Sequence, residues 1–301
     1  MKIIMYHYVR PDNSCYPFLN YLNLNIFQRQ LDYFQNKYGF ISKQDFINSI
    51  DSNEPAKGVV LSFDDGLKDH YKYVLPELKK RKLWGLFYIC SGVYSSRKML
   101  GVHRVQYLKG KYGSSVILKE ALNMIEDHML DESNIELFDK EIYIDSNYQE
   151  SEKKLRRLFN YYISYDYRDK ILDNLMKKYF NENKLFDEVY LNINELNEIH
   201  NEGNIIGSHA VTHKVLSRLS YADQEQEIKK SFDFLKTTIS LEPPYSFCYP
   251  YGYRASYNND TLKILKTNKI HNAVIFDNKE QSDSIERLEL SRLDCNKFME
   301  V

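Results

Sequence analysis

The chain has 301 residues, of which 43% are hydrophobic and 28% are charged, and its formal net charge is −1. This length can bury a large core, and the near-neutral charge argues against a nucleic-acid-binding protein or a polybasic membrane anchor. No stretch approaches the roughly 20 apolar residues that span a bilayer, and the N-terminus is too short and polar for a signal peptide. We therefore expect a cytoplasmic globular protein without stable membrane insertion; the sequence does not predict its oligomeric state.

Apolar runs typical of strands alternate with amphipathic patterns typical of helices along much of the chain. The first part predicts strands at 3–8, 58–63 and 84–90 and helices at 26–38 and 71–82. The last part predicts helices at 194–202, 221–239 and 261–269 and strands at 204–208, 246–249 and 273–276. This alternation indicates an α/β protein with a parallel sheet.

The pattern changes between about residues 95 and 188, where the sequence predicts charged helices at 116–128, 150–162 and 167–183 without a strong strand between them. No linker rich in Pro, Gly or Ser separates this region from the rest. We therefore expect one domain over residues 1–301, with residues 95–188 as a helical insertion. The insertion should shape a cleft or an oligomer contact rather than add strands to the sheet.

Two adjacent carboxylates, Asp64 and Asp65, end the predicted strand in the segment Ser-Phe-Asp-Asp-Gly. In parallel α/β proteins, catalytic groups gather at the carboxyl ends of strands. Adjacent carboxylates repel each other, so one of them needs a cation or a proton if both are buried. A solvated Asp-Asp-Gly turn is the alternative interpretation. His70, about one turn further along the chain, is expected to face solvent.

A histidine pair, His209 and His213, follows another predicted strand. Residues four apart can direct two imidazoles at one metal ion if the segment turns helically, although such pairs also arise by chance. Two histidine nitrogens and one carboxylate oxygen make up the ligand set of a catalytic zinc site with an open position. The remaining carboxylate is then free to act as a general base.

These segments resemble motifs of the polysaccharide deacetylase family, also called the NodB-homology family or carbohydrate esterase family 4. The first two family motifs, TFDDG and H[ST]xxH, correspond to residues 62–66 and 209–213, with Ala210 in place of Ser or Thr. Residues 247–252, FCYPYG, are similar to the third motif in the YPYG form of a bacterial subgroup. Residues 290–294, LSRLD, resemble the LPRID segment, and residues 5–11, MYHYVRP, resemble the start of that subgroup.

The resemblance implies a distorted (β/α) barrel of about seven strands and metal-assisted hydrolysis of an acetamide, or sometimes an ester, on a sugar. It implies that Asp64 is the general base and that Asp65, His209 and His213 hold one divalent metal ion. Zn²⁺ is expected, with Co²⁺ or Ni²⁺ able to replace it. The backbone N–H of Tyr251 would help to stabilise the tetrahedral oxyanion.

The sequence lacks two features of many family members. Cys248, expected like the other cysteines to be a reduced thiol, lies in the stretch where an arginine usually orients the base. Arg292 is expected either to pair with Asp64 in its place or to form a surface salt bridge. No histidine follows Arg292 to serve as the general acid, so His7 is the candidate that lines the metal site. His103 is a further candidate, but we expect it to be structural.

The predicted function is metal-dependent removal of an N-acetyl group from an amino sugar, a precursor in bacterial surface-polysaccharide biosynthesis. The expected partner is this acetylated sugar or polysaccharide precursor. Hydrolysis of another small amide or of a sugar O-acetyl ester is an alternative within the same class of enzyme. A non-catalytic carbohydrate-binding protein on a retained barrel is the alternative from another class.

Overall fold

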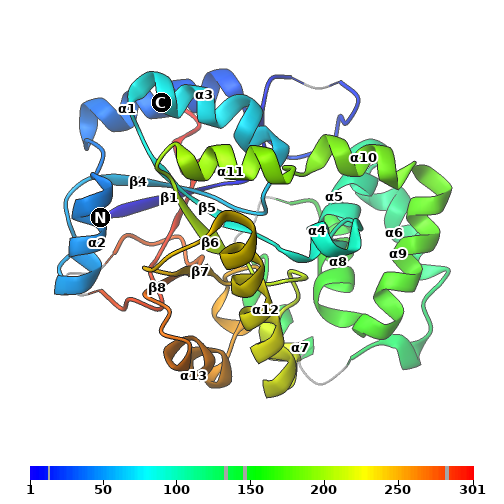
Figure 1. The fold of residues 1–301 in the computed structure, drawn as a ribbon. Helices are drawn as coiled ribbons and strands as arrows, with labels where there is room; N and C mark the ends of the chain where they lie inside the picture. Colours follow the sequence, from blue (N-terminus) through cyan, green and yellow to red (C-terminus); the bar gives the residue numbers. More distant parts are fainter. Residues whose placement is uncertain (13, 132–134, 145–147, 282–284) are drawn as a thin grey trace.

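The protein is built around a curled parallel sheet with helices on its outside (Figure 1). The computed structural model describes residues 1–12, 14–131, 135–144, 148–281 and 285–301. The sheet has seven strands in the order β8-β7-β6-β5-β4-β1-β9, and all neighbours are parallel. These strands are β1 (Lys2–Tyr6), β4 (Val59–Phe63), β5 (Gly85–Ile89), β6 (Ile205–Ser208), β7 (Ser246–Cys248), β8 (Asn272–Val274) and β9 (Leu293–Asp294). A second, two-stranded sheet pairs β2 (Val9–Arg10) with β3 (Leu22–Asn23).

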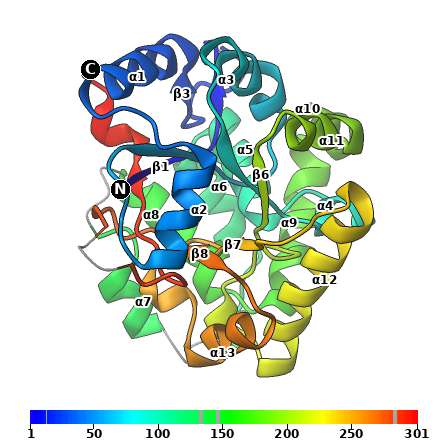
Figure 2. The same ribbon diagram turned by 60° about the vertical axis from the view of Figure 1, so that its left-hand side comes forward.

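The C-terminal segment contacts both edges of the curled sheet. Leu293 in β9 pairs with Ile4 of β1, whereas Leu290 forms a bridge to Val274 of β8. The segment then continues beside helix α1 (Leu24–Lys37), as Figure 2 shows. The side chain of Gln30 in this helix donates to the carbonyl of Cys295 at 2.9 Å. The seven parallel strands and this curvature confirm the α/β, distorted-barrel fold that the family resemblance implies.

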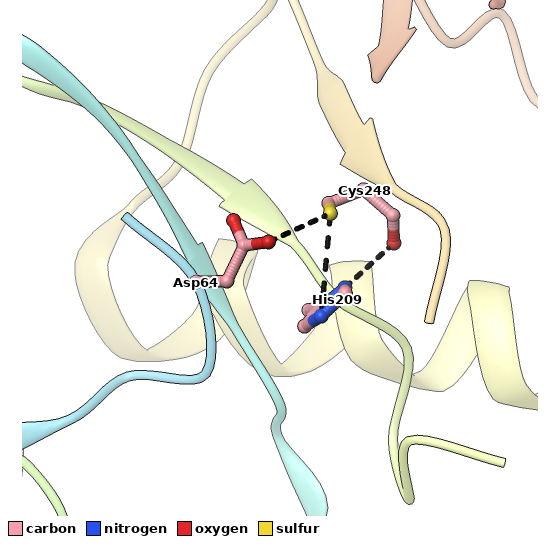
Figure 3. A group of neighbouring side chains, drawn as sticks. All are labelled: Asp64, His209 and Cys248. Carbon is pink, nitrogen blue, oxygen red and sulfur yellow. Dashed lines mark hydrogen bonds between the residues drawn. The ribbon is translucent and has the colours of Figure 1, made fainter. Parts of the chain in front are cut away.

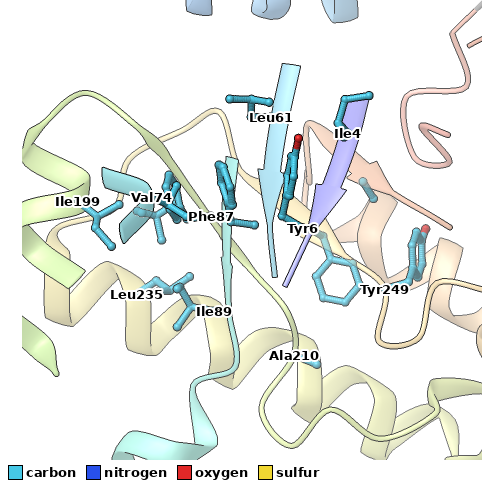
Figure 4. Close-up of a cluster of buried hydrophobic side chains, with 14 of the residues drawn as sticks. Ile4, Tyr6, Leu61, Val74, Phe87, Ile89, Ile199, Ala210, Leu235 and Tyr249 are labelled. Carbon is cyan, nitrogen blue, oxygen red and sulfur yellow. The ribbon is translucent and has the colours of Figure 1, made fainter. Parts of the chain in front are cut away.

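The strands read as continuous apolar runs because the sheet is covered on both faces. All five residues of β4 and all five of β5 are buried, as is usual for parallel sheets. Figure 4 shows Ile4, Leu61 and Phe87 from neighbouring strands in one cluster with residues of the surrounding helices. The helices around the sheet are α1 (Leu24–Lys37), α2 (Lys43–Ser52), α3 (Leu75–Arg81), α11 (Ile193–Asn201), α12 (Tyr221–Ile239) and α13 (Asn259–Thr267).

A group of helices lies to one side of the sheet, on the right in Figure 1. Its members connect β5 to β6 and are α4 (Gly92–Ser96), α5 (Gly101–Tyr112), α6 (Ser114–Leu122), α7 (Ile135–Glu141), α8 (Glu150–Arg157), α9 (Tyr165–Tyr179) and α10 (Glu182–Val189). The described residues of this region contain no strand beyond an isolated bridge between Leu130 and Ile163. Nowhere in the described parts of the chain is a helix both long and apolar enough to span a membrane.

Several helices differ from their predicted bounds. The helix predicted at 71–82 begins as a π-helical turn, His70–Val74, before α3. The one predicted at 167–183 is interrupted between α9 and α10. Helix α5 was not predicted, because its buried residues surround most of the helix and include polar side chains such as His103 and Lys109. Such a helix lacks the one-sided apolar stripe from which helices are recognised in a sequence.

Candidate active site

The carboxyl ends of two strands, β4 and β6, which lie on either side of β5, bring the predicted metal ligands together. Asp65 follows β4, and His209 and His213 follow β6. Nε2 of each histidine lies 3.5 Å from Oδ1 of Asp65, and the two imidazole centroids are 4.7 Å apart. All three side chains are at most 6% exposed. The structure therefore gathers the set that the two separate motifs indicate.

The loops that carry these residues have unusual backbone conformations that neighbouring elements hold in place. Asp65 and His213 have φ values of +78° and +56°, in the left-handed region that non-glycine residues rarely adopt. The carboxylate of Glu227 in α12 accepts from the backbone N–H groups of Val211 and Thr212 at 2.9 and 2.8 Å. Glu227 was not predicted, because it lies among the charged residues of a long helix.

The donor atoms around Oδ1 of Asp65 fit a divalent cation. His209 donates from Nδ1 to the carbonyl of Cys248 at 2.8 Å, so its Nε2 presents a lone pair to Asp65. Burial lowers the pKa of both imidazoles, to about 3 for His213, so both are neutral. Oδ1 of Asp65 is buried and has no hydrogen-bond partner among the described residues. The Nε2 lone pair of His209 and the unpartnered carboxylate oxygen repel each other unless a cation or a proton lies between them, and Nε2 of His213 is a third atom that can bind a cation there.

The other oxygen of Asp65 contacts a residue that was expected to be structural. His103 in α5 is fully buried, and its Nε2 lies 3.0 Å from Oδ2 of Asp65. Burial alone would raise the pKa of Asp65, but His103 and His213 outweigh it and hold that pKa well below its usual range. The sequence did not place the segment of His103; in the structure α5 carries His103 to the end of β4, where it contacts Asp65.

Arg292 pairs with Asp64, which decides between its two predicted roles. Nη1 of Arg292 donates to both carboxylate oxygens of Asp64 at 2.7 and 2.8 Å, and the arginine is only 1% exposed. Burial alone would raise the pKa of Asp64, but Arg292, followed by His209 and His7, lowers it below its ordinary value. The carboxylate is therefore ionised although it is buried.

Cys248 occupies the space beside this ion pair. Figure 3 shows Asp64, His209 and Cys248 converging, with the Cys248 sulfur 3.6 Å from Oδ2 of Asp64 and 4.0 Å from Nε2 of His209. Nη2 of Arg292 lies 3.2 Å from the same sulfur. The small thiol therefore leaves room for the guanidinium of Arg292, which directly precedes β9. The sequence did not predict a thiol close enough to bind a metal. Because the positive charge of Arg292 already faces this thiol, a cation fits better between Asp65 and the two histidines.

His7 lies at the mouth of the site. It follows β1, where Tyr6 pairs with Phe63, so His7 and Asp64 leave the sheet side by side. Nε2 of His7 is 3.9 Å from an oxygen of each aspartate, and its side chain is 37% exposed. His70, which was expected to face solvent, is instead fully buried and donates from Nε2 to the carbonyl of His7 at 2.9 Å. It thereby fixes the backbone of His7.

Tyr251 also borders the site, as the third motif predicts. It has a φ of +64°, and its ring packs edge-on against His213 with a centroid distance of 4.7 Å. A cleft of about 980 Å³ opens above the two aspartates and is lined from the sheet side and from the helices between β5 and β6. Its aromatic lining includes Tyr8, Tyr21, Tyr143, Tyr148, Tyr249, Tyr251 and Tyr253. Tyrosine offers both a flat apolar face and a hydroxyl to a ligand.

Comparison with solved structures shows the same fold in several deacetylases. The Streptococcus pyogenes deacetylase PplD, solved in complex with acetate, has a TM-score of 0.60 and 19% identity over 98% of this chain and 91% of its own. IcaB from Ammonifex degensii has a TM-score of 0.56 and 16% identity, with coverages of 97% and 90%. The BpsB deacetylase domain from Bordetella bronchiseptica has a TM-score of 0.56 and 11% identity, with coverages of 97% and 94%.

Comparison of sequences matches part of the chain to one family model. No curated protein matches the chain. Residues 171–273 match the family described as polysaccharide deacetylase. This stretch includes the histidine motif and the third motif, whereas the aspartate pair lies outside it. Residues 171–273 are therefore similar to the polysaccharide deacetylase family, and the chain shares its fold with these solved deacetylases.

Proposed function

We propose that the protein is a metal-dependent deacetylase that hydrolyses an N-acetyl group on an amino sugar in a precursor of a bacterial surface polysaccharide. The observation that carries this proposal is the convergence of two neutral imidazoles on an unpartnered oxygen of Asp65, beside an ionised Asp64. Asp65, His209 and His213 would hold one divalent ion, and Zn²⁺ suits two nitrogens and one oxygen. Such an ion supplies Lewis acidity toward an acetyl carbonyl and toward water.

Asp64 would act as the general base. It is buried in the same cluster, and its pairing with Arg292 keeps it ionised at neutral pH. Its Oδ2 lies on the side of His7, at 3.9 Å, and would accept the proton of the attacking water. The water oxygen then adds to the acetyl carbon, and the developing oxyanion would receive a hydrogen bond from the backbone N–H of Tyr251.

His7 would supply the proton that the leaving amine needs when the carbon–nitrogen bond breaks. It combines proximity to both aspartates with a partly exposed ring that faces the cleft, so a bound sugar can reach it. This assignment replaces the histidine that many family members carry near the C-terminus, in a segment where this chain has none. The products would be acetate and the free amino sugar.

The match of residues 171–273 to the polysaccharide deacetylase family supports a saccharide substrate. The tyrosine-lined cleft suits the apolar faces and hydroxyls of sugar rings. A non-catalytic binding protein would have no use for an arginine that keeps Asp64 ionised, which disfavours that alternative. Another amide or a sugar O-acetyl ester would use the same site. The cytoplasmic location expected from the sequence remains a prediction.

The test combines acetate release with metal content. Wild-type protein should release acetate from at least one member of a panel of nucleotide-linked and polymeric N-acetylated and O-acetylated sugars. Asp64→Asn should lower turnover on the order of 100-fold to 10,000-fold while the metal content stays near wild type. Asp65→Asn should lose both, because it removes a ligand. Asp64→Asn with wild-type turnover, and an unchanged thermal melt, would contradict the mechanism.

A further inference from the structure

We infer that His103 and Tyr190 are positioning residues that fix Asp65 for metal binding, so that the helices between β5 and β6 build part of the metal site. This inference rests on the proposed function, and it assigns a role to two residues that lie outside the family motifs. Both are buried, at 0% and 2% exposure. Neither touches the reacting atoms; each acts through the carboxylate of Asp65.

A continuous chain of hydrogen bonds runs from the backbone of Leu100, directly before α5, to Asp65. The N–H of Leu100 donates to the Tyr190 hydroxyl at 3.0 Å, and that hydroxyl lies 2.6 Å from Nδ1 of His103. Nε2 of His103 lies 3.0 Å from Oδ2 of Asp65. Every proton has an acceptor when Tyr190 donates to Nδ1 and His103 donates from Nε2, because a carboxylate can only accept. The chain therefore sets the tautomer of His103.

The two carboxylate oxygens of Asp65 have different surroundings. Oδ2 is bound to His103, whereas Oδ1 faces His209 and His213 without a hydrogen-bond partner of its own. Binding of one oxygen restricts rotation of the carboxylate, so the other is aimed at the two imidazoles before a metal arrives. Partners of this kind commonly contribute about 10-fold to 100-fold to metal affinity.

The same helices also hold the strained backbone of the aspartate loop. Asp65 has a φ of +78°, which costs free energy unless neighbouring contacts compensate. Just beyond it, Leu67 forms an antiparallel bridge with Tyr190, and the N–H of Leu191 donates to the carbonyl of Gly66 at 3.0 Å. Tyr190 therefore acts twice, through its hydroxyl on His103 and through its backbone on the loop.

The decisive comparison is between His103→Leu and His103→Gln in metal-free protein titrated with Zn²⁺ against a chromophoric chelator. Leucine fills the space without a donor and should weaken Zn²⁺ binding about 10-fold to 100-fold. Glutamine can place an amide N–H near the position of Nε2 and should restore most of that loss. A role in packing alone predicts the same affinity for both variants, which would overturn the inference.

Tyr190→Phe provides a second test that does not depend on folding of the His103 variants. It removes only the hydroxyl, so Zn²⁺ affinity should fall, by less than in His103→Leu because the donor on Nε2 is kept. Tyr94→Phe is the matched control, because the Tyr94 hydroxyl is buried without a hydrogen-bond partner among the described residues. This substitution should leave the Zn²⁺ affinity unchanged. If Tyr190→Phe binds Zn²⁺ with wild-type affinity, the inference fails but the proposed metal site stands. Wild-type protein that binds no Zn²⁺ would instead overturn the proposed metal site, and this inference with it.

Discussion

Arg292→Met tests how strongly the buried ion pair stabilises the folded protein and the ionised form of Asp64. Methionine keeps an unbranched apolar side chain but removes both hydrogen bonds to Asp64, at 2.7 and 2.8 Å, and those to Ser62 Oγ and the Ile275 carbonyl, at 2.9 and 3.1 Å. Asp64 is 1% exposed, and its nearest remaining basic nitrogens include Nε2 of His7 at 3.9 Å. Breaking a buried pair in this way typically lowers the free energy of unfolding by about 3–5 kcal/mol.

The assay is urea denaturation of chelator-treated protein, so that metal binding does not mask the change. Asp64→Asn and the double variant complete a cycle, in which the double variant should be more stable than the sum of the single losses implies, by about 1–3 kcal/mol. Arg254→Met is the matched control; its side chain is 60% exposed and lies 3.9 Å from Glu289, so the change should stay within about 0.5 kcal/mol. Additive losses in the cycle would refute the coupling of Arg292 to Asp64.

The same substitution should move the pH dependence of catalysis in a defined direction. In the wild type the pKa of Asp64 lies below its ordinary value, because Arg292 and the nearby histidines outweigh the effect of burial. Without the guanidinium, burial dominates and the pKa of Asp64 rises. Less of the base is then ionised near neutral pH, so the acidic limb of the kcat/KM profile should shift to higher pH. An unshifted limb would refute the assignment of Asp64 as the base.

Two further predictions concern residues that line the cleft. His7→Gln should lower amide hydrolysis on the order of 100-fold to 10,000-fold but reduce hydrolysis of p-nitrophenyl acetate far less, since that leaving group needs no proton; equal losses on both substrates would contradict a role as general acid. Burial, followed by the charge of Arg156, lowers the pKa of Lys109 to about 8, below the value of about 10.4 in an unfolded chain. Between these values only the unfolded chain holds the proton, so the unfolding free energy of wild type relative to Lys109→Met should rise by about 1–3 kcal/mol from pH 8 to pH 10. Parallel pH profiles of the two proteins in chemical denaturation would show that the lysine is not perturbed.

Local patterns in the sequence were enough to predict the sheet and the centre of the site. Residues of a parallel sheet that is covered on both faces are mostly apolar, so β4 and β5 appear as nearly continuous apolar runs. Asp64 and Asp65 directly follow one apolar run, and His209 and His213 lie in the short loop that follows a second apolar run. Because parallel strands end at the same edge, short-range spacing was sufficient to predict that these groups meet.

Only the tertiary structure decided which distant residues complete that centre. Arg292 reaches Asp64 because the C-terminal segment contacts both edges of the sheet, and no local pattern in the sequence specifies which strand such a segment faces. The position of His103 could not be predicted, because α5 is buried around most of its surface and so lacks an amphipathic period. Its partner Tyr190 lies 87 positions away in sequence. Hydrogen bonds across such separations depend on how helices pack, and hydrophobic periodicity records only which side of an element is buried.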